Sequence, residues 1–311
     1  MSFSSDVKEE LSKLNTLANK VQVKYELIGY MLTNHISIQK NKVLRYATES
    51  QYNINRFSKL LSNLSINHQI EIEGNMFVIK LKTKEIPFLL DYDVGKTIIS
   101  YKDIKLEEGI IERQKEKDEN LKAMIRGTFL GAGSINNPEN NYHLEILFSV
   151  KENTRYISNI LESVYGIYVK ELDMENKTSI YLKEAESISN FLALIGANKA
   201  MLKFEDIRIQ KEMRGKVNRI VNCETANLNK TLNAAVEQIN AIKKLQETGE
   251  FNKLDDDLKE VALLRLEYPN MSLAELGKRL KNPIGKSGVN YRLKKIMGVF
   301  GDGLKKLRKK D

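Results

Sequence analysis

An internal repeat is the feature that most constrains how this chain can fold. The segment Leu27–Leu32 matches Ile125–Leu130 at an offset of 98 residues, and Arg56-Phe57 matches Arg155-Tyr156 at an offset of 99. Such a period over residues 1–205 indicates two tandem copies of one structural unit, about 1–100 and 101–205. Two such copies would bury their sheet faces through a pseudo-two-fold pair of helices, so the repeat predicts an α+β domain.

Each copy has the predicted order helix, strand pair, helix, strand pair, helix. In the first copy, strands are expected at about 37–38, 43–48, 68–73 and 76–82, with a helix at 54–64. In the second copy, strands are expected at about 134–135, 142–150, 168–174 and 178–183, with helices at 153–165 and 186–194. Gly74-Asn75 is a natural hairpin turn, and Ser2 is a candidate cap for a first amphipathic helix.

The positive charge is concentrated at the C-terminal end of the chain. Residues 258–311 hold 14 basic and 5 acidic side chains, which accounts for the whole net charge of +9. The first 257 residues are therefore neutral in total. This asymmetry predicts a neutral domain followed by a basic module, and a basic module favours polyanionic partners such as double-stranded DNA.

Three short helical patterns follow one another in the basic module. The first ends before Pro269, and Ser272 with Glu275 forms a capping box for the second. The third runs from about Lys286 to Met297, with an apolar face of Val289, Leu293 and Ile296. Two short helices, a tight turn and a third helix with a polar outer face predict an all-α helix-turn-helix domain.

The outer face of the third helix supplies candidate DNA contacts. We expect bases to be read by Lys286, Ser287, Asn290, Tyr291 and Lys294. We expect phosphates to be contacted by Lys278, Arg279, Arg292, Lys295 and the tail residues Lys305, Lys306 and Arg308. The alternative is a three-helix bundle that only packs against another surface.

Several classes of protein are disfavoured by composition. Cys223 is the single cysteine, so an internal disulfide is excluded and a reducing, cytoplasmic setting is expected. The three histidines are far apart in the sequence, which argues against a zinc site. Because there is no run of about 18 apolar residues, no membrane span is expected. No cofactor is predicted.

The repeated motif resembles that of the LAGLIDADG homing endonucleases. In the second copy, Ile125–Ser134 follows the signature closely, but Ala132 stands where the resemblance implies a metal-binding acid. In the first copy, Asn34 holds that position. Metal-dependent phosphodiester cleavage needs a carboxylate at both positions, so the sequence predicts a degenerate domain without nuclease activity. We expect the nearby Glu26 and Glu49 to be solvated surface groups.

Longer motifs resemble the WhiA family over nearly the whole chain. They are Ser2–Lys8, Arg126–Ser134, Asn218–Thr231 and Pro283–Leu293, in that order. The resemblance implies a degenerate homing-endonuclease domain followed by a helix-turn-helix. It also implies a nucleoid-associated transcriptional regulator linked to cell division and chromosome segregation, and to sporulation in actinobacteria.

The segment between the domains has two interpretations. Apolar spacing predicts a helix at about 228–247, within a helical linker at 206–250 that precedes the helix-turn-helix at 251–311. The polar run Asn222–Thr231 is either a contact surface for DNA or the first domain, or a set of helix caps. We expect Cys223 to be a packed thiol.

Two functions compete with sequence-specific regulation. One is a protein-interaction scaffold, in which residues 1–205 bind a protein partner and DNA only positions the complex. The other is a residual metal-dependent nuclease of the homing type.

Overall fold

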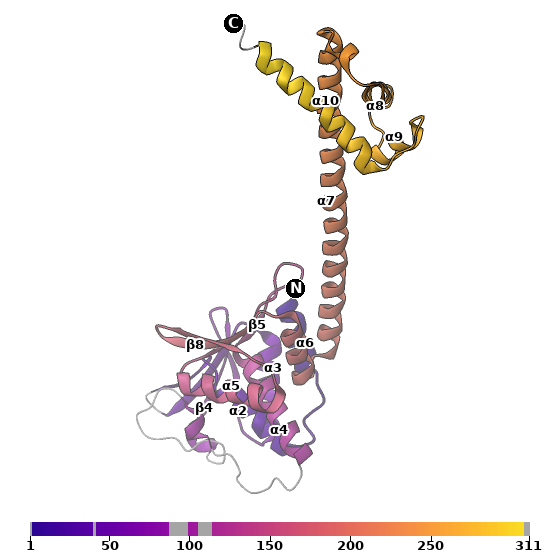
Figure 1. Cartoon of the computed structure of the whole chain (residues 1–311). Coiled ribbons are helices and arrows are strands. Elements are labelled where there is room, and N and C mark those ends of the chain that lie inside the picture. The colour runs from indigo at the N-terminus through magenta and orange to yellow at the C-terminus, as the bar shows by residue number, and fades with distance from the viewer. Residues whose placement is uncertain (1, 40–41, 87–98, 105–113, 308–311) are drawn as a thin grey trace. The chain divides into compact units, whose positions relative to one another are not determined.

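The structure is a computed structural model that describes residues 2–39, 42–86, 99–104 and 114–307. Contacts between residues divide the chain into two compact units, residues 1–212 and residues 213–311. Helix α7, Asn198–Glu247, contributes residues to both units. Figure 1 labels the elements along the chain, and each unit is described here by itself.

The first unit contains the two predicted copies. The first copy comprises α1 (Phe3–Ser12), α2 (Lys20–Met31), β1 (Ile36–Gln39), β2 (Val43–Thr48), α3 (Gln51–Asn63), β3 (Ile70–Glu73), β4 (Met76–Lys82) and the 3-10 turns η1 (Thr83–Glu85) and η2 (Tyr101–Asp103). The second copy comprises α4 (Gln114–Ala132), β5 (Gly133–Ile135), β6 (Leu144–Phe148), α5 (Lys151–Tyr165), β7 (Lys170–Met174), β8 (Lys177–Leu182) and α6 (Ala185–Ile195). The predicted order of elements is confirmed in the second copy and, in the first copy, as far as β4; the last helix expected in the first copy falls on a stretch that includes residues outside the described ones.

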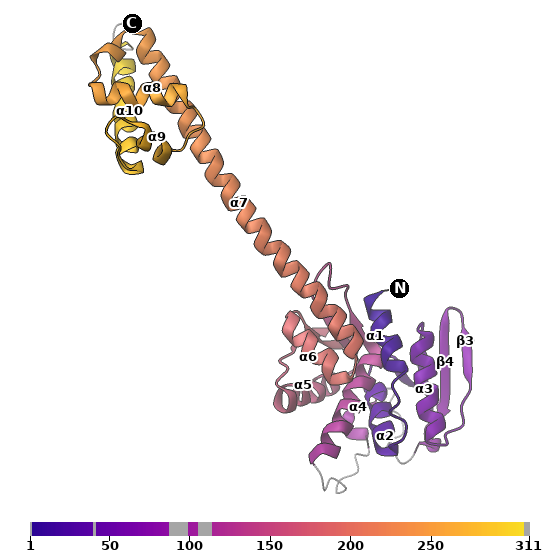
Figure 2. The same cartoon turned by 90° about the vertical axis from the view of Figure 1, so that its right-hand side faces the viewer.

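Two antiparallel sheets repeat the same topology. The strand orders are β1-β2-β4-β3 and β5-β6-β8-β7, so β3 and β7 are corresponding edge strands. Figure 2 shows α3 beside β4 and β3 in the first copy. Arg45 pairs with Lys80 in the first sheet, and Glu145 pairs with Tyr181 in the second. Because the registers also correspond, the repeat extends from the sequence to the pairing of individual residues.

Helices α2 and α4 pack backbone to backbone along the pseudo-two-fold axis. A Cβ added at Gly29 would lie 2.0 Å from the carbonyl oxygen of Met124, and one added at Gly127 would lie 2.0 Å from that of Glu26. No larger residue fits at either position without separating the helices. The two glycines are themselves repeat-related, since they lie 98 residues apart.

Two asparagines form hydrogen bonds between the copies, each to the C-terminal end of α2 or α4 in the other copy. The Asn53 side-chain amide donates to the carbonyl of Leu130 at 2.5 Å, and the Asn153 amide donates to that of Leu32 at 3.0 Å. Both asparagines are buried in the first turn of their helices, α3 and α5. These crossed bonds satisfy carbonyls at the helix ends that would otherwise lack a partner.

A buried charge network corrects one prediction. Glu26 is only 1% exposed rather than solvated. Its carboxylate accepts from Arg56 Nε at 2.7 Å and from Arg126 Nη1 at 3.2 Å, so it joins the two copies. Burial opposes the charge on Arg56, but the hydrogen bonds and charge of Glu26 outweigh it and raise the pKa of Arg56. Glu49 is exposed, as expected.

The second unit consists of helices. It contains the C-terminal part of α7, then η3 (Glu250–Lys253), α8 (Asp256–Glu267), α9 (Leu273–Arg279) and α10 (Lys286–Leu307). The sequence predicted a helical linker from 206 with a helix from about 228, whereas α7 is one continuous helix that begins at Asn198. The run Asn222–Thr231 lies in the middle of α7 and is exposed, so its side chains are not helix caps. Cys223 is likewise exposed, which corrects its expected packing.

No helix among the described residues is both long and apolar enough to cross a membrane.

Replacing Glu26 tests the buried network. Glu26→Ala leaves Arg56 and Arg126 buried without a counter-charge, which typically costs about 3–5 kcal/mol. Urea unfolding followed by circular dichroism should therefore show a large loss of stability. Glu49→Ala, at an exposed carboxylate in the same unit, should change stability by less than about 0.5 kcal/mol. Equal effects for the two variants would contradict the role assigned to Glu26.

Candidate nucleic-acid interface

Helix α9 begins with the predicted capping box. The Ser272 hydroxyl oxygen accepts from the Glu275 amide at 3.3 Å, and the Glu275 carboxylate accepts from the Ser272 amide at 3.0 Å. The Ser272 hydroxyl and amide lower the pKa of the Glu275 carboxyl, because their hydrogen bonds favour its charged form. The short helix α9 thus has a fixed starting point.

The turn between α9 and α10 depends on close contact at Gly277. A Cβ added to Gly277 would lie 2.2 Å from the carbonyl oxygen of Ile284. The Ile284 amide in turn donates to the Gly277 carbonyl at 3.1 Å. The sequence predicts a helix-turn-helix here, and the structure places α9, the turn and α10 in that order.

A common apolar core positions the three helices. The predicted apolar residues of α9 and α10 are buried together with residues of α7 and α8. The buried set is Ile242, Leu245, Leu254, Leu258, Val261, Ala262, Leu276, Leu280, Val289, Leu293 and Ile296. One face of α10 is therefore fixed against the domain, and its opposite face is directed outward.

The outward face of α10 carries the residues expected to read bases. Ser287, Tyr291 and Lys294 are exposed, with Tyr291 at 69%, and Asn290 is half-buried. No hydrogen bond joins these four side chains to any other described residue. Lys286 is exposed at the first position of the helix. The arrangement leaves amide, hydroxyl and ammonium groups available at one surface.

Three of the expected phosphate contacts are engaged within the domain. Arg292 Nη2 lies 2.8 Å from Asp257, and Lys295 Nζ lies 3.4 Å from Asp255. The Arg279 guanidinium stacks 4.3 Å from the centre of the Tyr268 ring. Lys278 is exposed. These contacts join α10 to the start of α8 and α9 to the end of α8.

The basic tail is only partly described. The backbone of Lys305 and Lys306 continues α10, but nothing is described of their side chains. Arg308 lies outside the described residues. Their expected role at phosphates stays a prediction.

Arg265 is a structural residue whose role sequence reasoning missed. It is 2% exposed, and its Nη1 donates to the carbonyls of Pro269 at 3.2 Å and Met271 at 2.8 Å. Burial lowers the pKa of Arg265. The place of Arg265 in an apolar helical pattern could have indicated that it is buried. A buried guanidinium needs carbonyl or carboxylate partners, so such contacts could then have been expected. It fixes the loop that leads into α9.

Asn34 and Ala132, which stand at the ends of the two LAGLIDADG-like motifs and are called the motif ends here, carry no carboxylate. Ala132 is the last residue of α4 and is 7% exposed, and Asn34 follows α2 with its side-chain oxygen buried and unpartnered. Burial lowers the pKa of His35, and the positive charge of Lys8 contributes to the same shift. Burial lowers the pKa of Lys8 itself to about 8. A lysine ammonium repels a divalent metal, and the Asn34 amide oxygen lacks the negative charge with which a carboxylate would hold one.

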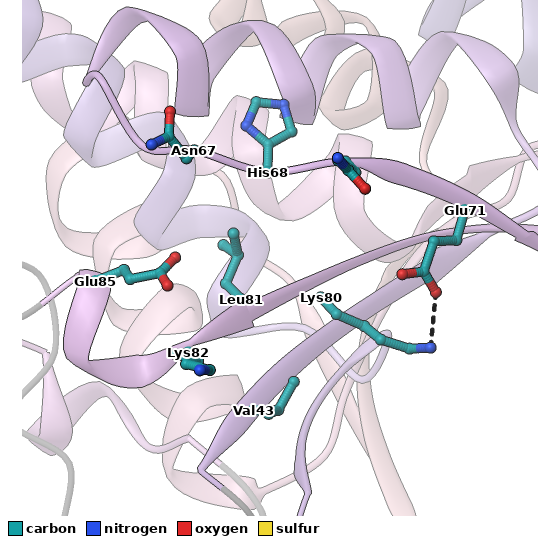
Figure 3. Close-up of a pocket in the computed structure, with 9 residues that line it drawn as sticks. Val43, Asn67, His68, Glu71, Lys80, Leu81, Lys82 and Glu85 are labelled. Atoms are coloured by element: carbon teal, nitrogen blue, oxygen red, sulfur yellow. Dashed lines mark hydrogen bonds and ion pairs between the residues drawn. The ribbon is translucent and has the colours of Figure 1, made fainter.

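In the part of the chain that the structure describes, no group of three or more His, Cys, Asp or Glu residues is arranged to hold a metal ion. A shallow pocket lies beside β2 and β4 (Figure 3). Its lining includes His68, Glu71 and Lys80, with Glu71 and Lys80 paired at 2.8 Å. The His68 ring donates from Nδ1 to the Ile66 carbonyl and so accepts the Ser58 hydroxyl at Nε2. His68, Glu71 and Lys80 therefore all have hydrogen-bond or ion-pair partners within the protein.

Comparisons with known proteins identify the family. The model of the WhiA LAGLIDADG-like domain matches residues 121–214, and the model of the WhiA C-terminal HTH domain matches residues 217–300. A "Probable cell division protein WhiA" from Clostridium botulinum is 40% identical over 306 residues, covering 95% of this chain and 96% of the relative. The chain belongs to the WhiA family. A WhiA protein from Staphylococcus haemolyticus is 37% identical over 309 residues, covering 95% of each chain.

A solved WhiA structure has the same fold. The "Crystal structure of full-length DUF199/WhiA from Thermatoga maritima" matches with a TM-score of 0.57 and 25% identity, covering 97% of this chain and 99% of that one. The predicted family and the predicted combination of a homing-endonuclease-like domain with a helix-turn-helix are thereby confirmed. The LAGLIDADG-like model falls on the second copy, where the motif follows the signature more closely.

Gly277 can be tested against a glycine in an open position. Gly277→Ala places a methyl group against the Ile284 carbonyl, so we expect it to destabilise the second unit by about 1–3 kcal/mol. Gly298→Ala, in α10 with no atom within 4 Å of the added Cβ, should stabilise by about 0.5–1 kcal/mol through helix propensity. Chemical denaturation of both variants measures the difference. A neutral or stabilising Gly277→Ala would show that the turn is not closely packed.

Proposed function

We propose that this chain is a DNA-binding transcriptional regulator of the WhiA type, in which α10 reads DNA sequence. The observation that carries the proposal is the outward face of α10, where Ser287, Asn290, Tyr291 and Lys294 have no hydrogen-bond partner among the described residues. The names of the relatives, each a probable cell division protein, support a link to cell division. Links to chromosome segregation and, in actinobacteria, to sporulation belong to the same proposal.

The chemistry of the α10 face suits base recognition in the major groove. An asparagine amide can bond to adenine through two hydrogen bonds, and a lysine ammonium can bond to guanine O6 and N7. We assign these roles to Asn290, Lys286 and Lys294, with Ser287 and Tyr291 beside them. A helix of this diameter fits the major groove, whereas the narrower minor groove would exclude it.

Phosphate contacts would position that face. Lys278 and Arg279 are exposed at the end of α9. Arg292 and Lys295 pair with exposed carboxylates, and such surface pairs are weak enough for phosphates to replace them. The tail residues Lys305, Lys306 and Arg308 would add attraction that does not depend on sequence.

The proposal includes the loss of nuclease activity. Homing-type cleavage requires a metal-bound carboxylate from each copy, whereas Asn34 and Ala132 supply none. The charge of Lys8, which acts on His35 next to Asn34 in the sequence, further disfavours a divalent cation. In this proposal, residues 1–205 are a structural and interaction domain, 206–250 a helical linker and 251–311 the DNA-binding domain of a cytoplasmic, nucleoid-associated protein.

A protein-interaction scaffold is the second candidate, and one observation favours it. The edge strand β3 is exposed along its whole length, with Ile72 at 73%. Tyr168, next to the corresponding edge strand β7, is 76% exposed. Exposed edge strands offer unpaired backbone groups to a partner strand. Capture of a partner by residues 1–212 that is lost with Ile72→Glu would support this candidate.

Replacing Asn290 tests the proposed readout. Asn290→Ala should lower the discrimination between the target and a variant with one changed base by about 1–3 kcal/mol. Lys278→Ala should instead weaken binding to all sequences to a similar degree and reduce the salt dependence of the affinity. Fluorescence-anisotropy titrations on a site selected from genomic fragments would separate these effects. Unchanged discrimination in Asn290→Ala would contradict the assigned role of Asn290.

A further inference from the structure

The edge strand β7 of the second sheet carries charges that the described part of the chain does not neutralise. The side chains of Lys170 and Glu171 are exposed and form no ion pair or hydrogen bond with any other described residue. The same holds for Lys177, the first residue of β8. Because β7 ends the strand order β5-β6-β8-β7, one side of its backbone has no neighbouring strand among the described residues. Unpaired backbone groups at such an edge can bind a further strand.

The charges on β7 alternate between the two faces of the sheet. The register places Glu171 opposite Ile180, whose side chain is buried in the apolar core. Glu171 and Asp173 therefore lie on the face that packs against the helices, and Lys170 and Leu172 lie on the open face. Leu172 is 46% exposed. Along the edge, the strand thus presents a cation, an anion, an apolar group and an anion.

The corresponding edge strand of the first copy lacks this pattern. By the registers of the two sheets, Gln69 and Ile70 correspond to Lys170 and Glu171. The two acidic residues of β3 are already paired with cations of their own sheet. Since both copies have the same topology, this fold does not require the unpaired charges on β7.

The pattern disfavours a second copy of this chain as the added strand. In an antiparallel pair of β7 strands centred on Leu172, Glu171 of each copy would lie opposite Asp173 of the other. Lys151 pairs with Asp173, but Glu171 has no such partner among the described residues. Like charges directly opposite each other destabilise strand pairing, and charges at sheet edges commonly prevent self-association. A strand with complementary charges does not meet this obstacle.

We propose that β7 binds an extended segment of another protein as an added strand of the second sheet. The charges specify an acidic residue opposite Lys170, a basic residue opposite Glu171 and an apolar residue opposite Leu172. Side chains two residues apart lie about 7 Å apart on one face of a strand. A second acidic residue would therefore lie opposite Met174, on the face from which Lys177 extends.

Opposite charges on the two faces also fix the register of the added strand. Shifting the segment by one residue brings either its acidic residue opposite Glu171 or its basic residue opposite Lys170. Either shift places like charges together, so the alternation selects one alignment. This inference rests on the interaction role proposed above for residues 1–205, and it is independent of DNA reading by α10.

Selection from a displayed library of random peptides tests the proposal on the full chain. The wild type should enrich peptides with the order acidic, basic, apolar. The double variant Lys170→Glu with Glu171→Lys should enrich the inverted charges. In anisotropy titrations it should bind peptides selected by the wild type about 10-fold more weakly, because two attractive cross-strand pairs become repulsive. Gln69→Glu with Ile70→Lys, at the corresponding positions of β3, is the matched control and should select the same peptides as the wild type.

The outcomes of this selection separate β7 from other sites. Enrichment of peptides without complementary charges, or of the same peptides by the charge-swapped variant, would overturn the proposal. Binding that is lost with Ile72→Glu but not with the charge swap would also overturn it, while leaving the interaction role of the domain to β3. If labelled oligothymidylate, and no peptide, binds in a manner that depends on Lys170, the occupant is a nucleic acid and the proposal is wrong.

Hydrogen exchange locates the bound peptide without relying on a variant. With a selected peptide bound, the backbone amides of β7 should exchange more slowly, because a neighbouring strand protects them. A ligand held only by side chains on the open face would not slow these amides. Unchanged exchange in β7 at a saturating peptide concentration would overturn the proposal.

Discussion

The close contact between α2 and α4 is the constraint on which the first unit depends. Gly29 and Gly127 allow the two helix backbones to touch, and the other contacts that join the two copies at these helices depend on that approach. The crossed bonds from Asn53 and Asn153 reach the ends of these helices only because the helices are adjacent. The buried carboxylate of Glu26 can serve arginines from both copies for the same reason.

This contact also explains how a fold of the homing-endonuclease type can persist without carboxylates at its two motif ends. The helix pair is held by glycines, asparagine amides and a buried ion network, none of which depends on the residues at the motif ends. Asn34 and Ala132 therefore occupy the motif ends without taking part in the contacts that hold the helix pair. On the sheet, Arg45 pairs with Glu73, and Lys80 pairs with Glu71 and Glu73, so these cations are partly neutralised within the domain. The basic groups without such partners include Lys286 and Lys294 on α10.

The features that sequence could predict were those with a local or periodic signature. The repeat, the hairpin at Gly74-Asn75, the capping box at Ser272 and the apolar face of α10 all follow from short spacings. The buried state of Glu26 could not be predicted, because its arginine partners lie 30 and 100 residues away. The early start of α7 was missed because its middle contains Gly215 and five asparagines between residues 218 and 233, which are weak helix formers. The ion pairs of Arg292 and Lys295 with α8 were missed because they join different helices.

Selection of DNA by the intact chain tests the central claim most directly. The full chain would be incubated with a genomic fragment library and magnesium, and the bound fragments would be recovered, sequenced and examined for strand breaks. The account predicts enrichment of a common sequence in uncut DNA, and loss of that enrichment when Asn290, Tyr291 and Lys294 are replaced together by alanine. Undiminished enrichment in that variant, or magnesium-dependent breaks at the bound site, would contradict the account.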